Sequence, residues 1–215
     1  DPETNRAYSE DDLEHAMREE TRRYFAHVLP QNRRIQDFID SDYTFLNEPL
    51  ARHYGIPGIS HQEFRQVKLK PEHQRGGLLG HGSVLTATSN GVETQPVLRG
   101  VWILENLLGT PPSPPPPDIE PIEPDVRGVS TIRELMEKHR NNATCFECHR
   151  KIDPLGLAME PYDFLGRWRD RYGKKIPLNA TGNMPDGTAI NGPAGIRGSV
   201  SYTHLRAHET VLDLV

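Results

Sequence analysis

Apolar side chains recur at helical spacing in three stretches of the chain. Residues 11–29 gather theirs on one face, with charged residues elsewhere, and Pro30 ends the pattern. Residues 131–140 open with the Thr-x-x-Glu sequence of a helix capping box. Residues 96–109 start with a proline and repeat apolar side chains at the same spacing, namely Val97, Val101, Leu104 and Leu108. This period is that of an amphipathic α-helix, so each stretch predicts a helix.

The segments between these helices predict shorter elements. Residues 33–40 are expected to form a short helix, and residues 42–56 to be helical throughout. Residues 63–70 alternate between apolar and polar positions, which favours a short strand. Residues 76–93 are rich in Gly, Ser and Thr and predict a loop with at most one helical turn, while residues 174–198 predict short strands and turns. The expected fold class is therefore mainly α, with a few short strands and long loops.

A proline-rich run separates the last two long helices. Eight of the fourteen residues from Pro111 to Pro124 are proline. Such a run favours an extended polyproline II conformation. We expect a rigid connector or a strap over a surface, and a ligand for an SH3-type domain is the sharper alternative.

Composition narrows the classes of protein. Over 215 residues, only 35% are hydrophobic and Gly and Pro number 18 and 19, which indicates a loop-rich chain with a modest core. A formal charge of −5 argues against a nucleic-acid partner, and no apolar run is long enough to span a membrane. Because the chain opens at Asp1 without an initiator Met, we expect it to continue upstream, where a signal peptide would lie.

Both cysteines lie in one pentapeptide, Cys145-Phe-Glu-Cys148-His149. Cys-x-x-Cys-His is the attachment pattern of c-type haem, in which both thiols bond to the porphyrin and the histidine ligates the iron. A zinc site would need two further ligands, and His149 directly after Cys148 is badly placed to share one tetrahedral ion with it. A redox dithiol would be expected in a βαβ context, which is not predicted here. Haem c is the favoured hypothesis, with zinc, dithiol and chance as alternatives.

Longer segments carry a family resemblance. SDYTFLNEPLARHYGIPG, RGGLLGHGSVLTATSNGVETQPVLRGVWILENLLGTPPSPPPP, CHRKIDPLGLAMEPYDFLGRWR and IPLNATGNMPDGTAINGPAGIRG cover much of the chain before Ser201. They resemble the multidomain cytochromes typical of planctomycetes, which are built from domains of unknown function 1592, 1588 and 1585. The resemblance implies the helical end of one domain at residues 1–60 and a haem c-binding domain at 61–173. It also implies the start of a third domain at 174–199. Residues 200–215 resemble translated sequencing-adaptor read-through and are excluded from the fold.

The second axial ligand of a haem on His149 stays open at this level. Met184, followed by proline in a turn, and His81, in a glycine-rich loop, are the two candidates. Asp153 is expected to lie in a turn that ends the haem-bearing helix and to cap the next piece, with a catalytic role in a peroxidase-like site as the alternative. Tyr162, Arg167 and Trp168, and further Arg75 and Arg99, are candidates for propionate or ring contacts, with an ordinary surface salt bridge as the alternative for each.

The sequence therefore predicts an electron-transfer module with one covalent haem c in a larger exported protein. The haem-bearing segment is expected to pack between the helices at 97–108 and 131–140. A redox partner protein or a neighbouring haem domain would be its partner, and the resemblance implies a periplasmic or cell-surface location. The alternatives are a haem-dependent, peroxidase-like oxidoreductase and a zinc-stabilised binding module without haem, so whether the chain is an enzyme stays open.

Overall fold

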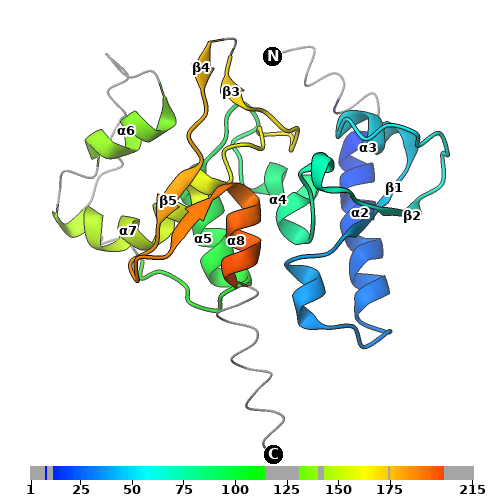
Figure 1. The fold of residues 1–215 in the computed structure, drawn as a ribbon, viewed down its shortest axis with the longest axis horizontal. Coiled ribbons are helices and arrows are strands. Elements are labelled where there is room, and N and C mark those ends of the chain that lie inside the picture. The colour runs from blue at the N-terminus through cyan, green and yellow to red at the C-terminus, as the bar shows by residue number, and fades with distance from the viewer. Residues whose placement is uncertain (1–7, 9–11, 115–130, 140–142, 174, 201–215) are drawn as a thin grey trace, which may run out of the picture. The chain divides into compact units, whose positions relative to one another are not determined.

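A computed structural model describes residues 8, 12–114, 131–139, 143–173 and 175–200 of the chain (Figure 1). These residues fall into two compact units. Unit 1 contains residues 1–94, 162–168 and 197–215, and unit 2 contains residues 95–161 and 169–196. Because each unit combines segments that are far apart in the sequence, the domain boundaries near residues 60 and 173 stay predictions.

Unit 1 is built around its first long helix, α2 (Leu13–Val28), as the sequence predicted. The helix contacts strand β1 (Tyr43–Leu46), helix α3 (Glu48–His53) and helix α4 (Gly82–Ala87). A short 3₁₀ helix, Ile35–Phe38, takes the place of the predicted helix at 33–40. The core combines residues from all of these neighbouring segments: Leu13, Ala16, Met17, Leu46, Leu50, Ala51, Tyr54, Ile56 and Leu69.

The helix predicted over residues 42–56 is wrong in its first half. Tyr43–Leu46 forms β1, which pairs antiparallel with β2 (Arg65–Lys68) in the register Tyr43 to Lys68. The helical half begins only at Glu48, where the side chain of Asn47 accepts a hydrogen bond from the backbone nitrogen of Leu50 at 3.2 Å. Such an N-cap starts a helix and separates it from the strand before it. The strand depends on a partner some twenty residues downstream, which a local pattern does not reveal.

The glycine-rich segment at 76–93 is more helical than predicted. It contains a 3₁₀ helix, Leu78–Gly80, followed by α4. Gly82 lies where an added Cβ would be 2.7 Å from Cγ of Met17 and 2.6 Å from the hydroxyl oxygen of Tyr54. The lack of a side chain at Gly82 thus lets α4 approach α2 closely.

Unit 2 centres on the contact between α5 (Pro96–Asn106) and α7 (Ala143–Ala158). An added Cβ at Gly100 would lie 2.2 Å from the backbone oxygen of Ile152, and one at Gly156 would lie 1.9 Å from that of Pro96. The two helices therefore cross backbone against backbone, and each contributes a glycine to the crossing. The buried face of α5 includes Arg99, Gly100, Ile103 and Leu104. Of the predicted face, Leu104 is buried, whereas Val97, Val101 and Leu108 are only half-buried, so the true face is rotated from the predicted one.

The prediction that Asp153-Pro154-Leu155-Gly156 ends the haem-bearing helix is wrong. Helix α7 continues through Pro154 to Ala158. Proline in a helix removes one intrahelical hydrogen bond and is costly. The helix nevertheless continues because every residue from Ile152 to Ala158 is buried. Packing therefore outweighs the local preference.

Helix α7 has a different second neighbour from the predicted one. It packs on α5 and on the hairpin of β5 (Thr181–Asn183) and β6 (Ala189–Asn191), rather than between α5 and α6 (Ile132–His139), among the residues that the structure describes. The capping box of α6 is present: the hydroxyl oxygen of Thr131 accepts from the backbone nitrogen of Glu134 at 3.2 Å, and the Glu134 carboxylate accepts from that of Thr131 at 3.2 Å.

The end of the described chain holds short strands, as predicted, and one unpredicted helix. Strands β3 (Arg171–Tyr172) and β4 (Ile176–Pro177) form one antiparallel pair, and β5 and β6 form another. Helix α8 (Gly192–Val200) then follows in glycine-rich sequence, with Ile196 and Val200 buried. The fold is thus mainly helical with a few short antiparallel strands. The proline-rich strap lies largely outside the described residues, since these stop at Pro114 and resume at Thr131.

Candidate functional site

The cysteine–histidine pentapeptide lies on α7, within unit 2. Cys148 is a free, half-buried thiol, and Phe146 is 45% exposed. The Cys145 side chain lies outside the described residues, as does that of His139. This part of α7 is therefore open to solvent on the side that carries Phe146, whereas the helix beyond Lys151 is fully buried.

His149 is held by a buried carboxylate one helical turn further along. Its Nδ1 lies 2.9 Å from Oδ1 of Asp153, and the two side chains are 20% and 0% exposed. Residues four apart lie on the same face of a helix, so the continuation of α7 through Pro154 creates this pair. Because an ionised carboxylate only accepts hydrogen bonds, this contact favours the tautomer with the proton on Nδ1, in which Nε2 is the nitrogen that can ligate a metal. This is the arrangement in which a histidine ligates a metal.

The pairing of Asp153 with His149 was not predicted from the sequence. The signal was present in the spacing of His149 and Asp153, which is i, i+4. It was lost because Pro154 predicted a helix end at that point.

Met184, one candidate for the second axial ligand, lies in the turn between β5 and β6 in unit 2. Its backbone nitrogen donates to the Thr188 carbonyl at 2.9 Å, and its carbonyl accepts from Gly187 at 2.9 Å. The hairpin packs on α7 so closely that a Cβ at Gly182 would lie 2.8 Å from Cα of Pro154. The structure thus brings the hairpin that carries Met184 against the helix that carries His149.

His81, the other candidate, is a buried residue of unit 1. It is 2% exposed, its Nδ1 lies 2.9 Å from the Thr21 hydroxyl, and its ring meets Tyr24 edge-on at 4.8 Å between centroids. Burial lowers the pKa of the imidazole, and nearby Arg75 acts in the same direction while Glu20 opposes it. His81 is therefore neutral near pH 7. Its role as an iron ligand stays a prediction.

The predicted ring contacts Tyr162, Arg167 and Trp168 form one compact turn in unit 1. Tyr162 is fully buried, donates its hydroxyl to the Gln74 carbonyl and meets Trp168 edge-on at 5.4 Å. Asp163 organises the turn, since it accepts from Arg167 Nε at 2.8 Å and from backbone nitrogens. Each side chain thus has a structural partner, and haem contact by these residues stays a prediction.

The two other arginines that were considered for propionates are buried. In unit 1, Arg75 donates to the carbonyls of Gly80 and Gly166, and its guanidinium carbon lies 3.4 Å above the Tyr54 ring. In unit 2, Arg99 donates to the Met159 carbonyl at 3.0 Å and lies 3.9 Å from the Glu160 carboxylate. Both arginines therefore have interior partners that tie segments of their units together.

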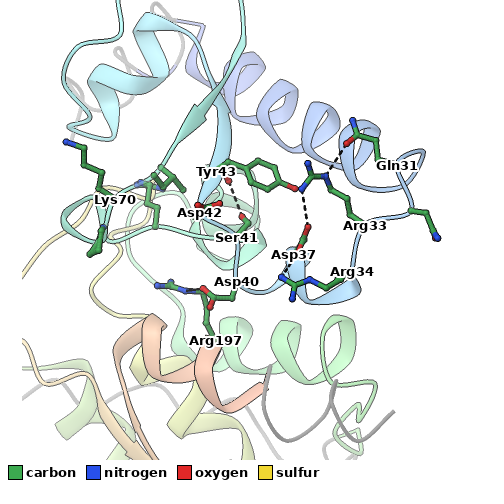
Figure 2. Close-up of a pocket in the computed structure, with 14 residues that line it drawn as sticks. Gln31, Arg33, Arg34, Asp37, Asp40, Ser41, Asp42, Tyr43, Lys70 and Arg197 are labelled. Carbon is green, nitrogen blue, oxygen red and sulfur yellow. Dashed lines mark hydrogen bonds and ion pairs between the residues drawn. The ribbon is translucent and has the colours of Figure 1, made fainter. Parts of the chain in front are cut away.

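Unit 1 also contains a polar cavity of about 790 Å³ (Figure 2). Its charged lining groups largely pair with one another. Asp37 lies 3.6 Å from both Arg33 and Arg34, and Asp40 lies 3.2 Å from Arg197. The other charged lining groups, Asp42, Lys70 and Arg75, have partners outside the lining.

Two kinds of feature are absent from the described part of the chain. Among the described residues, no three or more His, Cys, Asp or Glu side chains cluster in a way that would hold a metal ion. None of the described helices combines the length and apolar character needed to cross a membrane. The zinc hypothesis stays a prediction, because the side chain of Cys145 lies outside the described residues.

The fold and the site define a mainly helical protein in which helix α7 carries a Cys-x-x-Cys-His sequence and is buried from Ile152 to its end at Ala158. Residues 75–172 match the family model PSCyt3, a protein of unknown function (DUF1588), and residues 1–56 match PSD4, a protein of unknown function (DUF1592). Both matches are to domains of the family that the sequence suggested, and the family names point to cytochrome c-related multidomain proteins. The third domain, 1585, stays a prediction. Neither the curated proteins nor the solved structures that were searched gave a match.

Proposed function

We propose that α7 carries one covalent haem c and that the chain is an electron-transfer module of a larger exported protein. Cys145 and Cys148 would form the thioethers and His149 would be the proximal ligand. The observation that carries this proposal is the 2.9 Å contact between His149 Nδ1 and the buried Asp153, which fixes the ring and makes Nε2 the nitrogen that would ligate iron.

The described donors fit such a group. Cys148 is a free thiol with partial exposure, and His149, next to it on the same helix, is also partly exposed. When bound, the haem supplies reversible one-electron chemistry at its iron. The chain's own part is to fix the His149 ring, to exclude water with the buried end of α7, and to offer a second ligand. The Met184 hairpin, which packs on α7, supports Met184 as that ligand.

A haem-dependent oxidoreductase is the second candidate. A histidine held by a carboxylate donates more electron density to iron than one bonded to a neutral acceptor, and this favours reaction at an open coordination position. The two candidates differ in iron coordination. Six-coordinate, low-spin iron would support electron transfer, and five-coordinate, high-spin iron that turns over peroxide would support the enzyme.

The test is covalent haem content. The chain is expressed with a haem c maturation system in the periplasm, and the pyridine haemochrome spectrum of the purified protein is recorded. One haem per chain is expected, and none in the Cys145→Ser/Cys148→Ser double variant. A chain that matures without haem and binds one equivalent of zinc would overturn the proposal in favour of the zinc-stabilised binding module.

A periplasmic or cell-surface location follows from the same proposal, because haem c is attached outside the cytoplasmic membrane. The partner would then be a redox protein or a neighbouring haem domain of the same polypeptide. Stopped-flow spectroscopy of the holoprotein mixed with a soluble electron donor of lower potential would measure the rate of electron transfer to the haem.

A further inference from the structure

The two acidic side chains that flank His149 on α7 differ in their surroundings. Asp153 is 0% exposed and bonded to His149. Glu147 is 67% exposed and pairs with Arg150 at 2.9 Å, on the solvent side of the same helix. A charge buried from water interacts far more strongly with its neighbours than an exposed one. Of these two carboxylates, Asp153 is therefore the one placed to act on the ligating atom of His149.

The effect of Asp153 passes through the imidazole ring. Its carboxylate fixes the proton on Nδ1, so the ring has one tautomer and one orientation. The hydrogen bond also draws the proton towards oxygen, which leaves more electron density on Nε2. A more basic ligand stabilises ferric iron more than ferrous iron and lowers the reduction potential.

We propose that Asp153 is a positioning residue that locks the Nδ1–H tautomer of His149 and sets the reduction potential of the iron that His149 ligates. This inference rests on the proposed haem function and deepens it.

The first experiment needs no haem. The unmodified chain is labelled with ¹⁵N-histidine before haem attachment, and long-range ¹H–¹⁵N spectra identify the tautomer of His149, assigned by its loss in His149→Gln. The Nδ1–H form is expected to dominate. A dominant Nε2–H form would overturn the proposal, whatever the haem content.

The second experiment compares the midpoint potentials of three holoproteins: unmodified, Asp153→Asn and Glu147→Gln. Each variant removes one carboxylate from the same helix. We expect Asp153→Asn to raise the ratio of reduced to oxidised iron at a given electrode potential at least tenfold, which is about 59 mV for one electron. Glu147→Gln should change that ratio less than twofold. Equal shifts in the two variants would overturn the inference.

The two proposals fail differently. If no covalent haem forms, the proposed function fails, and the tautomer in the unmodified chain still decides whether Asp153 orients His149. If haem forms and Asp153→Asn leaves the potential unchanged, the proposed function stands and the role of Asp153 is wrong. If Asp153→Asn does not fold, resonance Raman spectra of the unmodified ferrous protein, with a distal ligand displaced, report the iron–histidine stretch. A low frequency, typical of a neutral acceptor, would contradict the proposal.

Discussion

Gly156 is the position where one added methyl group should do most damage to the helix that carries the candidate site. Its Cβ would lie 1.9 Å from the carbonyl oxygen and 2.5 Å from the carbonyl carbon of Pro96, whereas ordinary contact begins at 3.4 Å. Both neighbours are backbone atoms, which cannot rotate away as a side chain could. Helices α5 and α7 must therefore separate locally by about 1.5 Å, the difference between 3.4 and 1.9 Å.

The magnitude follows from two opposing effects. Gly→Ala in a helix interior ordinarily gains up to about 1 kcal/mol, because alanine loses less backbone entropy on folding. Overpacking of a core typically costs about 1–3 kcal/mol. The clash with fixed backbone puts Gly156→Ala at the upper end of that cost. We therefore expect a net loss of about 2–3 kcal/mol in the free energy of unfolding.

The assay is urea unfolding followed by circular dichroism, with Gly198→Ala as the matched control. Gly198 also lies in a helix, α8, but an added Cβ there meets nothing within 4 Å. The control should be unchanged or stabilised by up to about 1 kcal/mol. Gly100→Ala should destabilise like Gly156→Ala, and the double variant should cost less than the sum, because the helices are already apart. A Gly156→Ala chain as stable as the control would refute the close crossing of α5 and α7.

Three further predictions concern the ligand and the buried polar groups. Met184→Ala in the holoprotein should convert low-spin iron to high-spin iron and raise the affinity of the iron for added imidazole at least tenfold. His81→Ala should have this effect only if His81 is the ligand. Unchanged spectra in both variants would exclude both residues as the second axial ligand. Glu20→Ala removes the carboxylate that accepts hydrogen bonds from two buried hydroxyls. In urea unfolding, this variant should lose roughly 1–3 kcal/mol of the free energy of unfolding for each hydroxyl. A loss below about 0.5 kcal/mol, roughly a tenth of the stability of a marginally stable domain, would contradict the prediction. Burial lowers the pKa of His53, although its hydrogen bond to the Leu165 carbonyl opposes this. As the pH falls, His53 is therefore protonated at a higher pH in the unfolded chain than in the folded one. The free energy of unfolding should then decrease as the pH drops below about 6.5. The free energy of unfolding should depend less steeply on pH in His53→Asn than in the control His15→Asn, whose histidine is exposed. Identical slopes in the two variants would contradict the role of His53 in this pH dependence.

Much of the candidate site was determined by local sequence. The spacing of Cys145, Cys148 and His149 is a chemical requirement of haem attachment, and it needs no knowledge of the fold. Helices α2 and α6 were likewise predictable, because a sustained period or a capping box acts within a few residues of itself. The same holds for the family resemblance, which depends on short motifs.

Only the tertiary structure decided which faces and ends those elements have. The strand at Tyr43–Leu46 exists because β2 pairs with it, and the buried face of α5 includes Arg99 because the Met159 carbonyl accepts its hydrogen bond. The decisive case is Pro154. Its local preference ends a helix, but burial of the following turn keeps α7 intact and so places Asp153 beside His149. A local pattern measures what a segment prefers alone, whereas these outcomes depend on partners that are distant in the sequence.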